Sequence, residues 1–202
     1  MKSLSDFLLL LILALPSFAV VDPDPDQIGV YFDENADITC IDMAPSTPFW
    51  AYVIITRPTS PEIHGVEFSF CPAVEPGYEG MVFRLNAMWA GGGIDITPVI
   101  IDLCSDGAIR GFVVPIVPQQ DNALVLSLQY MLLAPLTLDF HLGPFPAPTF
   151  DNGLPAYKGA GDEIIPLGVS SGDPDLPVAS VNGCNAVPVE NANFGEVKAL
   201  FR

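Results

Sequence analysis

One short motif has the residue spacing of a hydrolase active site. Gly168-Val169-Ser170-Ser171-Gly172 matches G-x-S-x-G, in which a serine nucleophile stands at a sharp turn between a strand and a helix. Asp173-Pro174-Asp175-Leu176-Pro177 follows, and prolines at that spacing oppose a helix. Neither His64 nor His141 comes after Ser170, where the base of such a triad is found. We therefore interpret the motif as a Gly/Ser turn.

A second group of residues has carboxylates at the spacing of a calcium-binding loop. Asp22-Pro23-Asp24-Pro25-Asp26 alternates acids with prolines, and Asp33 stands at the twelfth position, where such loops carry an acidic ligand. Gln27, however, occupies the place of the turn glycine. We interpret the segment as an extended acidic stretch, with cation binding as the alternative.

The other candidate acids and bases lie in strand-like sequence. Asp139 and His141 would share one strand face, about 7 Å apart by strand rise. Two side chains do not complete a metal site, so a solvated strand face is expected. His64, beside Gly65, is expected in a turn or at a strand start rather than as a catalytic base. The remaining carboxylates are too numerous to single out a glycosidase pair. We therefore assign no catalytic residue, no metal ligand and no cofactor site.

Two tryptophans could stack on sugar rings. Trp50 and Trp89 are both flanked by apolar, strand-like sequence. Because large aromatic side chains in such surroundings are usually buried, we expect both in the core. A sugar-binding platform is the alternative.

The cysteines predict cross-links. Cys40, Cys71, Cys104 and Cys184 are far apart, and none belongs to a C-x-x-C pair of the zinc or thioredoxin type. An even number of cysteines in an exported chain favours two disulfides, and the sequence leaves their pairing open.

The elements that must position these residues follow a leader. Lys2 precedes an apolar run from Phe7 to Leu15, then Pro16 and the small-x-small tripeptide Ser17-Phe18-Ala19. This is the layout of a cleaved signal peptide, and the run is shorter than the about 20 apolar residues that a membrane helix needs. We expect residues 1–19 to be the signal peptide, residues 20–190 one β-sandwich domain, and residues 191–202 a short amphipathic tail. The predicted location is extracellular or periplasmic, with no membrane span.

Prolines and short β-rich runs indicate an all-β fold. The chain has 21 prolines, which prevent long helices by removing backbone donors. Val66–Phe70 and Leu136–Leu142 alternate apolar and polar residues, as half-buried strands do. Asn122–Leu133 fits both a strand and a helix, and we predict a strand. Gly91-Gly92-Gly93 is expected to form a bend. The other predicted strands are Ile28–Asp33, Phe49–Thr56, Met81–Trp89 and Ile109–Val117.

The predicted fold class is an antiparallel β-sandwich with a long Pro/Gly-rich loop region from Phe140 to Pro188. The layout is similar to cohesin-like or carbohydrate-binding-module-like sandwiches, an analogy of fold alone.

The charge balance excludes some partners. Seven Lys and Arg face 24 Asp and Glu, which gives a net charge of −17. No basic stripe is left to neutralise phosphates, so nucleic acid and anionic membrane surfaces are disfavoured as partners.

Several segments resemble an uncharacterised family of bacterial secreted β-sandwich proteins. Members begin with a DPDPD–GVYFD segment, as in Asp22–Asp33 here, and end in a WG-x-[IV]-K-x-[LM]-[YF]-R tail, as in Phe194–Arg202 with Phe194 in place of Trp. Similar intervening segments are Pro155-Ala156-Tyr157, Ile165-Pro166-Leu167 and Asp175–Gly183. The resemblance spans most of the mature chain. It implies export and the extent of the domain, and it implies no activity.

The sequence predicts a secreted, non-enzymatic β-sandwich protein that acts in surface adhesion, matrix assembly or glycan binding. A glycan or another surface protein is the expected partner. The alternative is a secreted hydrolase that uses carboxylates. Two convergent carboxyl groups in a deep cleft would favour the hydrolase, whereas a flat aromatic face would favour the binding protein.

Overall fold

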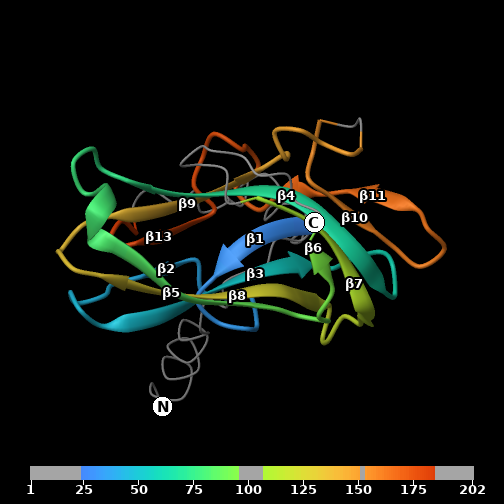
Figure 1. Cartoon of the computed structure of the whole chain (residues 1–202), viewed down its shortest axis with the longest axis horizontal. Helices are drawn as coiled ribbons and strands as arrows, with labels where there is room; N and C mark the ends of the chain where they lie inside the picture. The colour runs from blue at the N-terminus through green and yellow to red at the C-terminus, as the bar shows by residue number, and fades with distance from the viewer. Residues whose placement is uncertain (1–23, 96–106, 151–152, 185–202) are drawn as a thin grey trace, which may run out of the picture.

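Two β-sheets pack face to face in the computed structural model, which describes residues 24–95, 107–150 and 153–184 (Figure 1). The predicted signal peptide and amphipathic tail lie outside the described residues, as does Cys104. No helix among the described residues is long and apolar enough to cross a membrane.

The first sheet has five strands in the order β12-β1-β3-β8-β5. They are β12 (Gly168–Val169), β1 (Gln27–Tyr31), β3 (Pro48–Thr56), β8 (Asn122–Leu132) and β5 (Val82–Trp89). A single 3-10 turn among the described residues, η1 (Glu79–Met81), leads into β5.

The second sheet has the order β11-β10-β4-β9-β13-β2, and β7 joins it by pairing with both β4 and β6. The strands are β11 (Ile164–Pro166), β10 (Ala156–Lys158), β4 (Ile63–Val74), β9 (Leu138–Gly143), β13 (Ala179–Val181), β2 (Cys40–Ile41), β7 (Ala108–Ile116) and β6 (Ile94–Asp95). Within the described chain β4 is the longest strand, and it pairs with β7, β9 and β10.

Alternating side chains from both sheets build the core between them. Phe49, Ala51 and Val53 of β3 are buried, and so are Phe70 of β4 and Phe140 of β9. The rings of Phe70 and Phe140 are 5.6 Å apart between centroids, so aromatic contacts join the core across strands. Side chains of successive strand residues point to opposite faces, which is why every second residue is buried.

The predicted all-β sandwich is confirmed, including the strand at Asn122–Leu132 and the bend at Gly91-Gly92-Gly93, whose φ angles are all positive. The structure adds two details to the prediction. The described residues between Phe140 and Pro188 are mainly loop, and four short strands among them, β10, β11, β12 and β13, complete both sheets. Two strand pairs in the described chain, β1 with β12 and β2 with β13, are parallel, and the others are antiparallel.

One predicted disulfide is resolved by the structure. Cys40 and Cys184 are bonded, at a sequence separation of 144 residues. Cys71 is also disulfide-bonded, and none of the described cysteines is free. The Cys40–Cys184 disulfide ties the end of the described chain to β2, beside the parallel β2–β13 pair.

Candidate binding surface

The register of three strands gathers large side chains on the outer face of the first sheet. Trp50 of β3 lies opposite Gln129 of β8, which in turn lies opposite Asn86 of β5. Residues paired across an antiparallel ladder share a face, and the neighbours of Trp50 in β3, Phe49 and Ala51, face the core.

The same register brings two more rows to this outer face. Tyr52 is opposite Ser127, which is opposite Met88, and Pro48 is opposite Met131, which is opposite Phe83. Phe83 is 44% exposed and Met88 50% exposed. We call this surface the aromatic face, and it consists of Trp50, Tyr52, Phe83, Met88, Gln129 and Met131.

The two aromatic residues of β3 form a stacked pair. The rings of Trp50 and Tyr52 are 6.4 Å apart between centroids and 16° from parallel. The expectation that Trp50 packs in the core was therefore wrong, because the two-residue period of the strand places it opposite the buried Phe49 and Ala51. Its apolar neighbours in sequence belong to the other face.

Trp89 behaves as expected and packs against the core. Its ring lies 6.2 Å from that of Phe68 between centroids. The guanidinium of Arg110 stands 4.9 Å from the centre of the Trp89 ring, a cation–π contact. Trp89 is thus not part of the exposed aromatic face.

An acidic turn borders the aromatic face beside Tyr52. Asp33 accepts hydrogen bonds from the backbone N–H groups of Asp37 (3.0 Å) and Ile38 (2.8 Å), which closes the turn. Partial burial raises the pKa of the Tyr52 phenol, and the nearby carboxylates of Glu34 and Asp33 raise it further. The negative charge at this border would attract a cationic group of a partner.

The G-x-S-x-G motif does not form a nucleophile elbow. Gly168–Val169 forms β12, but turns rather than a helix follow it. The Oγ of Ser170 is buried, and a Cβ placed on Gly29 would lie 2.6 Å from it. A nucleophile must be open to substrate, so this serine serves close packing between β12 and β1.

The calcium-like spacing of the acidic segment is split by a strand. β1 separates Asp26 from Asp33, so the two carboxylates are at opposite ends of an extended segment, about 20 Å apart by strand rise. Both oxygens of Asp26 also accept hydrogen bonds, from Tyr157 Oη (2.7 Å) and from Thr59 N–H (2.8 Å) and Oγ1 (2.9 Å). These two carboxylates therefore do not share one loop, and Asp26 is a structural hydrogen-bond acceptor.

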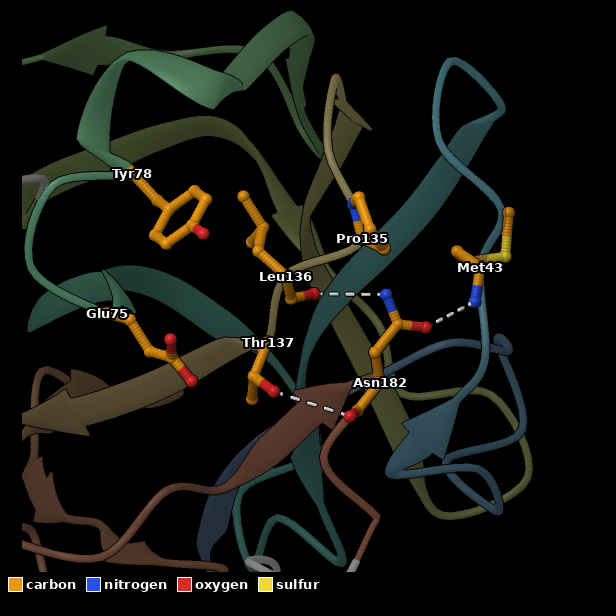
Figure 2. Close-up of a pocket in the computed structure, with 7 residues that line it drawn as sticks. All are labelled: Met43, Glu75, Tyr78, Pro135, Leu136, Thr137 and Asn182. Atoms are coloured by element: carbon orange, nitrogen blue, oxygen red, sulfur yellow. Dashed lines mark hydrogen bonds between the residues drawn. The ribbon is translucent and has the colours of Figure 1, made fainter.

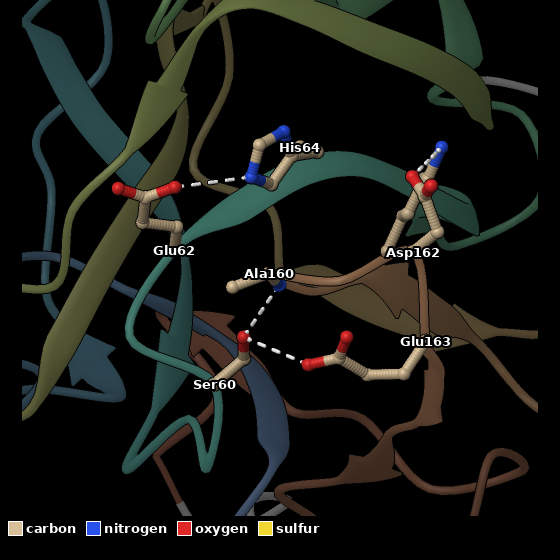
Figure 3. Close-up of polar contacts among 7 residues, drawn as sticks. Ser60, Glu62, His64, Ala160, Asp162 and Glu163 are labelled. Carbon is tan, nitrogen blue, oxygen red and sulfur yellow. Dashed lines mark hydrogen bonds and ion pairs between the residues drawn. The ribbon is translucent and has the colours of Figure 1, made fainter.

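The acids and bases near the start of β4 form separate pairs rather than a catalytic relay (Figure 3). Ser60 Oγ contacts Glu163 Oε1 at 3.2 Å and accepts from the backbone N–H of Ala160 at 2.8 Å. His64 Nε2 instead lies 3.1 Å from Glu62. Because serine and histidine have different partners, the arrangement lacks the nucleophile–base contact of a triad.

Other carboxylates also have structural tasks. Glu67 is buried, and its Oε2 accepts hydrogen bonds from the backbone N–H (2.9 Å) and the hydroxyl of Thr149, which hold the segment after β9 over the outer face of β4. Two further carboxylates, Asp37 and Asp121, line a cavity of about 430 Å³ together with the positively charged side chain of Arg57.

Asp139 and His141 do share one face of β9, as expected. Among residues 24–95, 107–150 and 153–184 no three His, Cys, Asp or Glu residues are grouped as metal ligands.

Comparison with solved structures finds the same architecture in cohesin modules. The sixth cohesin of scaffoldin B from Acetivibrio cellulolyticus, solved in complex with a mutant Cel5 dockerin, has a TM-score of 0.50 and 6% identity, over 79% of this chain and 99% of that one. A type II cohesin domain from the cellulosome of the same organism has a TM-score of 0.50 and 11% identity, over 81% and 98%. The chain has a cohesin-like β-sandwich fold. At these identities the likeness extends to the fold alone. No family model and no curated protein sequence matches the chain.

Proposed function

We propose that this protein is a secreted, non-enzymatic binding module that holds a protein partner on the aromatic face. The observation that carries the proposal is the continuous outer surface of Trp50, Tyr52, Phe83, Met88 and Met131 across three strands. Trp50, Phe83, Met88 and Met131 lie on the face opposite the main core, whereas Tyr52 also packs against the small cluster of Tyr31, Ala36 and Ile54 at the edge of this face. Contiguous exposed apolar surface of this kind marks interaction sites.

The composition of the face favours a protein over a glycan. Aromatic residues and methionine are enriched at protein interfaces, where flexible thioethers adapt to the partner. A cohesin of the same fold was solved in complex with a dockerin, which is a protein module. Glycan binding is the second candidate, favoured by the stacked pair of Trp50 and Tyr52 beside the amide of Gln129.

Secretion belongs to the same proposal. The leader-like residues 1–19 and the Cys40–Cys184 disulfide both support export into an oxidising compartment. A role in adhesion or matrix assembly at a surface is part of the same proposal, and the exposed aromatic face supports it.

Site-specific photo-crosslinking tests the proposal. A photoreactive phenylalanine analogue replaces Met88 on the aromatic face or, as the control, Ile164 on β11 of the other sheet, which is 39% exposed. We expect a discrete protease-sensitive adduct from the Met88 position in the native extracellular fraction, and its loss in a Trp50→Ala, Tyr52→Ala background. Adducts that are sensitive only to glycosidases would move the assignment to glycan binding. Equal adducts from both positions would overturn the proposed surface.

A further inference from the structure

A second cavity lies over the other sheet, away from the aromatic face. It has a volume of about 330 Å³ and lies over β4, β7 and β10. Gly65 of β4 is paired with Gly111 of β7 on one side and with Lys158 of β10 on the other, so one row across three strands runs from a lysine to two glycines. We call this cavity the glycine socket.

The structure requires glycine at one of the two socket positions and not at the other. A Cβ on Gly65 would lie 2.9 Å from the carbonyl oxygen of Arg110, so the close approach of β7 requires glycine there. Gly111 has no such need: its φ is outside the left-handed region, and no described atom lies within 4 Å of a Cβ built on it. Glycine within a strand costs about 0.5–1 kcal/mol relative to alanine. Glycine in a strand marks a bulge or the close approach of a backbone or ligand; a bulge follows Gly111, and the open space over its Cα leaves room for a ligand.

The walls of the socket are apolar. Ile109, which is buried, and Phe150, which is half-buried, line it beside the bare backbone of the glycines. Immediately after Gly111, the register of β7 against β4 shifts and leaves Val113 74% exposed and Val114 63% exposed. A flat ring could lie on the glycines between these side chains, as aromatic rings do over strand glycines.

The charged residues that line the glycine socket are basic, whereas the chain as a whole is acidic. The protein has 24 Asp and Glu, yet no carboxylate lines the socket, whereas Lys158, Arg110 and His64 do. The guanidinium of Arg110 is held over Trp89, so Lys158 is the cation best placed to contact a bound anion.

The current partner of Lys158 is replaceable. Its Nζ lies 2.6 Å from Asp162 Oδ1, and the hydrogen bond and charge of Lys158 lower the pKa of Asp162, with a smaller contribution from His64. The side chain of Asp162 is 84% exposed. Exposed pairs of this kind are weak, so a carboxylate held in the socket could take the place of Asp162.

We infer that the glycine socket binds an aromatic ring that carries a carboxylate, with the ring on Gly65 and Gly111 and the carboxylate on Lys158. The site lies on the second sheet and does not depend on the proposed function of the aromatic face. Its ligand is defined by two features that can be varied separately, the ring and the negative charge.

A nuclear magnetic resonance titration of the isotope-labelled exported protein tests the site with two probes. N-acetyltryptophan carries the ring and the carboxylate, and N-acetyltryptophanamide carries the ring alone. We expect shifts at the backbone amides of Gly65, Gly111 and Lys158 with both probes, and binding of the acid roughly fivefold to tenfold tighter, the range of a partly exposed charge contact. Shifts confined to other residues, or equal binding of acid and amide, would overturn the inference.

Two variants separate binding from folding. Gly111→Val places a side chain in the space over Gly111, at a position where the backbone accepts one, so the fold should persist. Both probes should then bind at least tenfold more weakly. Gly80→Val is the matched control, because Gly80 is also open and lies in η1. Lys158→Gln should weaken only the acid, to the level of the amide. Full binding by Gly111→Val, or an undiminished preference for the acid in Lys158→Gln, would contradict the assigned site.

Discussion

A carboxylate at the start of β1 and a phenol in β10 join segments that are far apart in sequence. Tyr157 Oη donates to Asp26 and accepts from the backbone N–H of Ser60 at 3.2 Å, while Asp26 also accepts from Thr59. These contacts link the chain before β1, the connection between β3 and β4, and β10. Asp26 belongs to the DPDPD segment and Tyr157 to the PAY segment of the family resemblance. We call the hydrogen-bonded cluster of Asp26, Thr59, Ser60 and Tyr157 the clamp.

Removing the phenol of Tyr157 should destabilise the fold. Tyr157→Phe leaves Asp26 and the N–H of Ser60 each without one partner, which we expect to lower the free energy of unfolding by about 1–3 kcal/mol. Urea denaturation measures the loss. The control is Tyr78→Phe, because Tyr78 is 42% exposed and a change there should stay within about 0.5 kcal/mol. Equal stabilities of the two variants would contradict the clamp.

The same residue should make stability depend on alkaline pH. Burial raises the pKa of Tyr157 above its ordinary value, and Asp26 raises it further against the lowering effects of Thr59 and Ser60. A raised pKa means that the folded state holds the proton more tightly, so this stabilisation is complete below about pH 10 and is lost as pH rises through the folded value. Denaturation between neutral and strongly alkaline pH should show the gap between wild type and Tyr157→Phe narrowing above that point. A constant gap would contradict it.

At the scale of elements, a single asparagine connects three segments at one end of the sandwich (Figure 2). Asn182 Oδ1 accepts from the N–H of Met43 at 2.7 Å, and its Nδ2 donates to the carbonyl of Leu136 at 3.0 Å. Thr137 donates to the backbone carbonyl of Asn182 at 3.3 Å. Asn182 has a φ of 60°, a left-handed conformation that asparagine tolerates. It therefore holds β13 in place next to the Cys40–Cys184 disulfide.

Two substitutions at Asn182 separate its side-chain bonds from its backbone conformation. Asn182→Gly loses only the two side-chain hydrogen bonds, which we expect to cost about 1–3 kcal/mol in unfolding free energy. Asn182→Ala keeps a Cβ at positive φ but lacks the short polar side chain that makes this conformation tolerable for asparagine, so it should cost about 1–2 kcal/mol more than glycine. Chemical denaturation of both variants checks the order. If alanine were as stable as glycine at this position, the backbone part of the argument would fail.

The strands that could be predicted are those whose pattern is local. β4, β8 and β9 have enough residues to display a two-residue period or a dense apolar run. β12 and β13 have two and three residues, and each is a strand only because β1 or β9 lies beside it. No window of the sequence contains both partners, so these strands were read as loop.

The aromatic face could be predicted only in part, because its residues come together through strand register. Alternation in β3 could have separated Trp50 and Tyr52 from the buried Phe49 and Ala51, a signal that the sequence interpretation passed over. Phe83, Met88 and Met131 join them only through the register between β5 and β8, which also contains a bulge after Arg84. Long-range register of this kind is not encoded in any one segment.

At the scale of the whole molecule, structural and functional residues occupy different places. The hydrogen bonds around Asp26 and Asn182 join segments that are distant in sequence and stabilise the sandwich. The outer surfaces carry two exposed features, the aromatic face on one sheet and the glycine socket on the other. This separation suits a module whose rigid scaffold presents a partner-binding surface.

The most direct test of this division is the affinity of the crosslinked protein partner for variants of the aromatic face. Isothermal titration calorimetry would compare the wild type with Trp50→Ala, Tyr52→Ala and with the control Ile164→Ala. The proposed function predicts that the double variant, measured under conditions where it is folded, binds at least about 30-fold more weakly, as for a hot-spot cluster that contributes about 2 kcal/mol or more. The control should bind like the wild type. Undiminished affinity of the folded double variant would contradict the central claim.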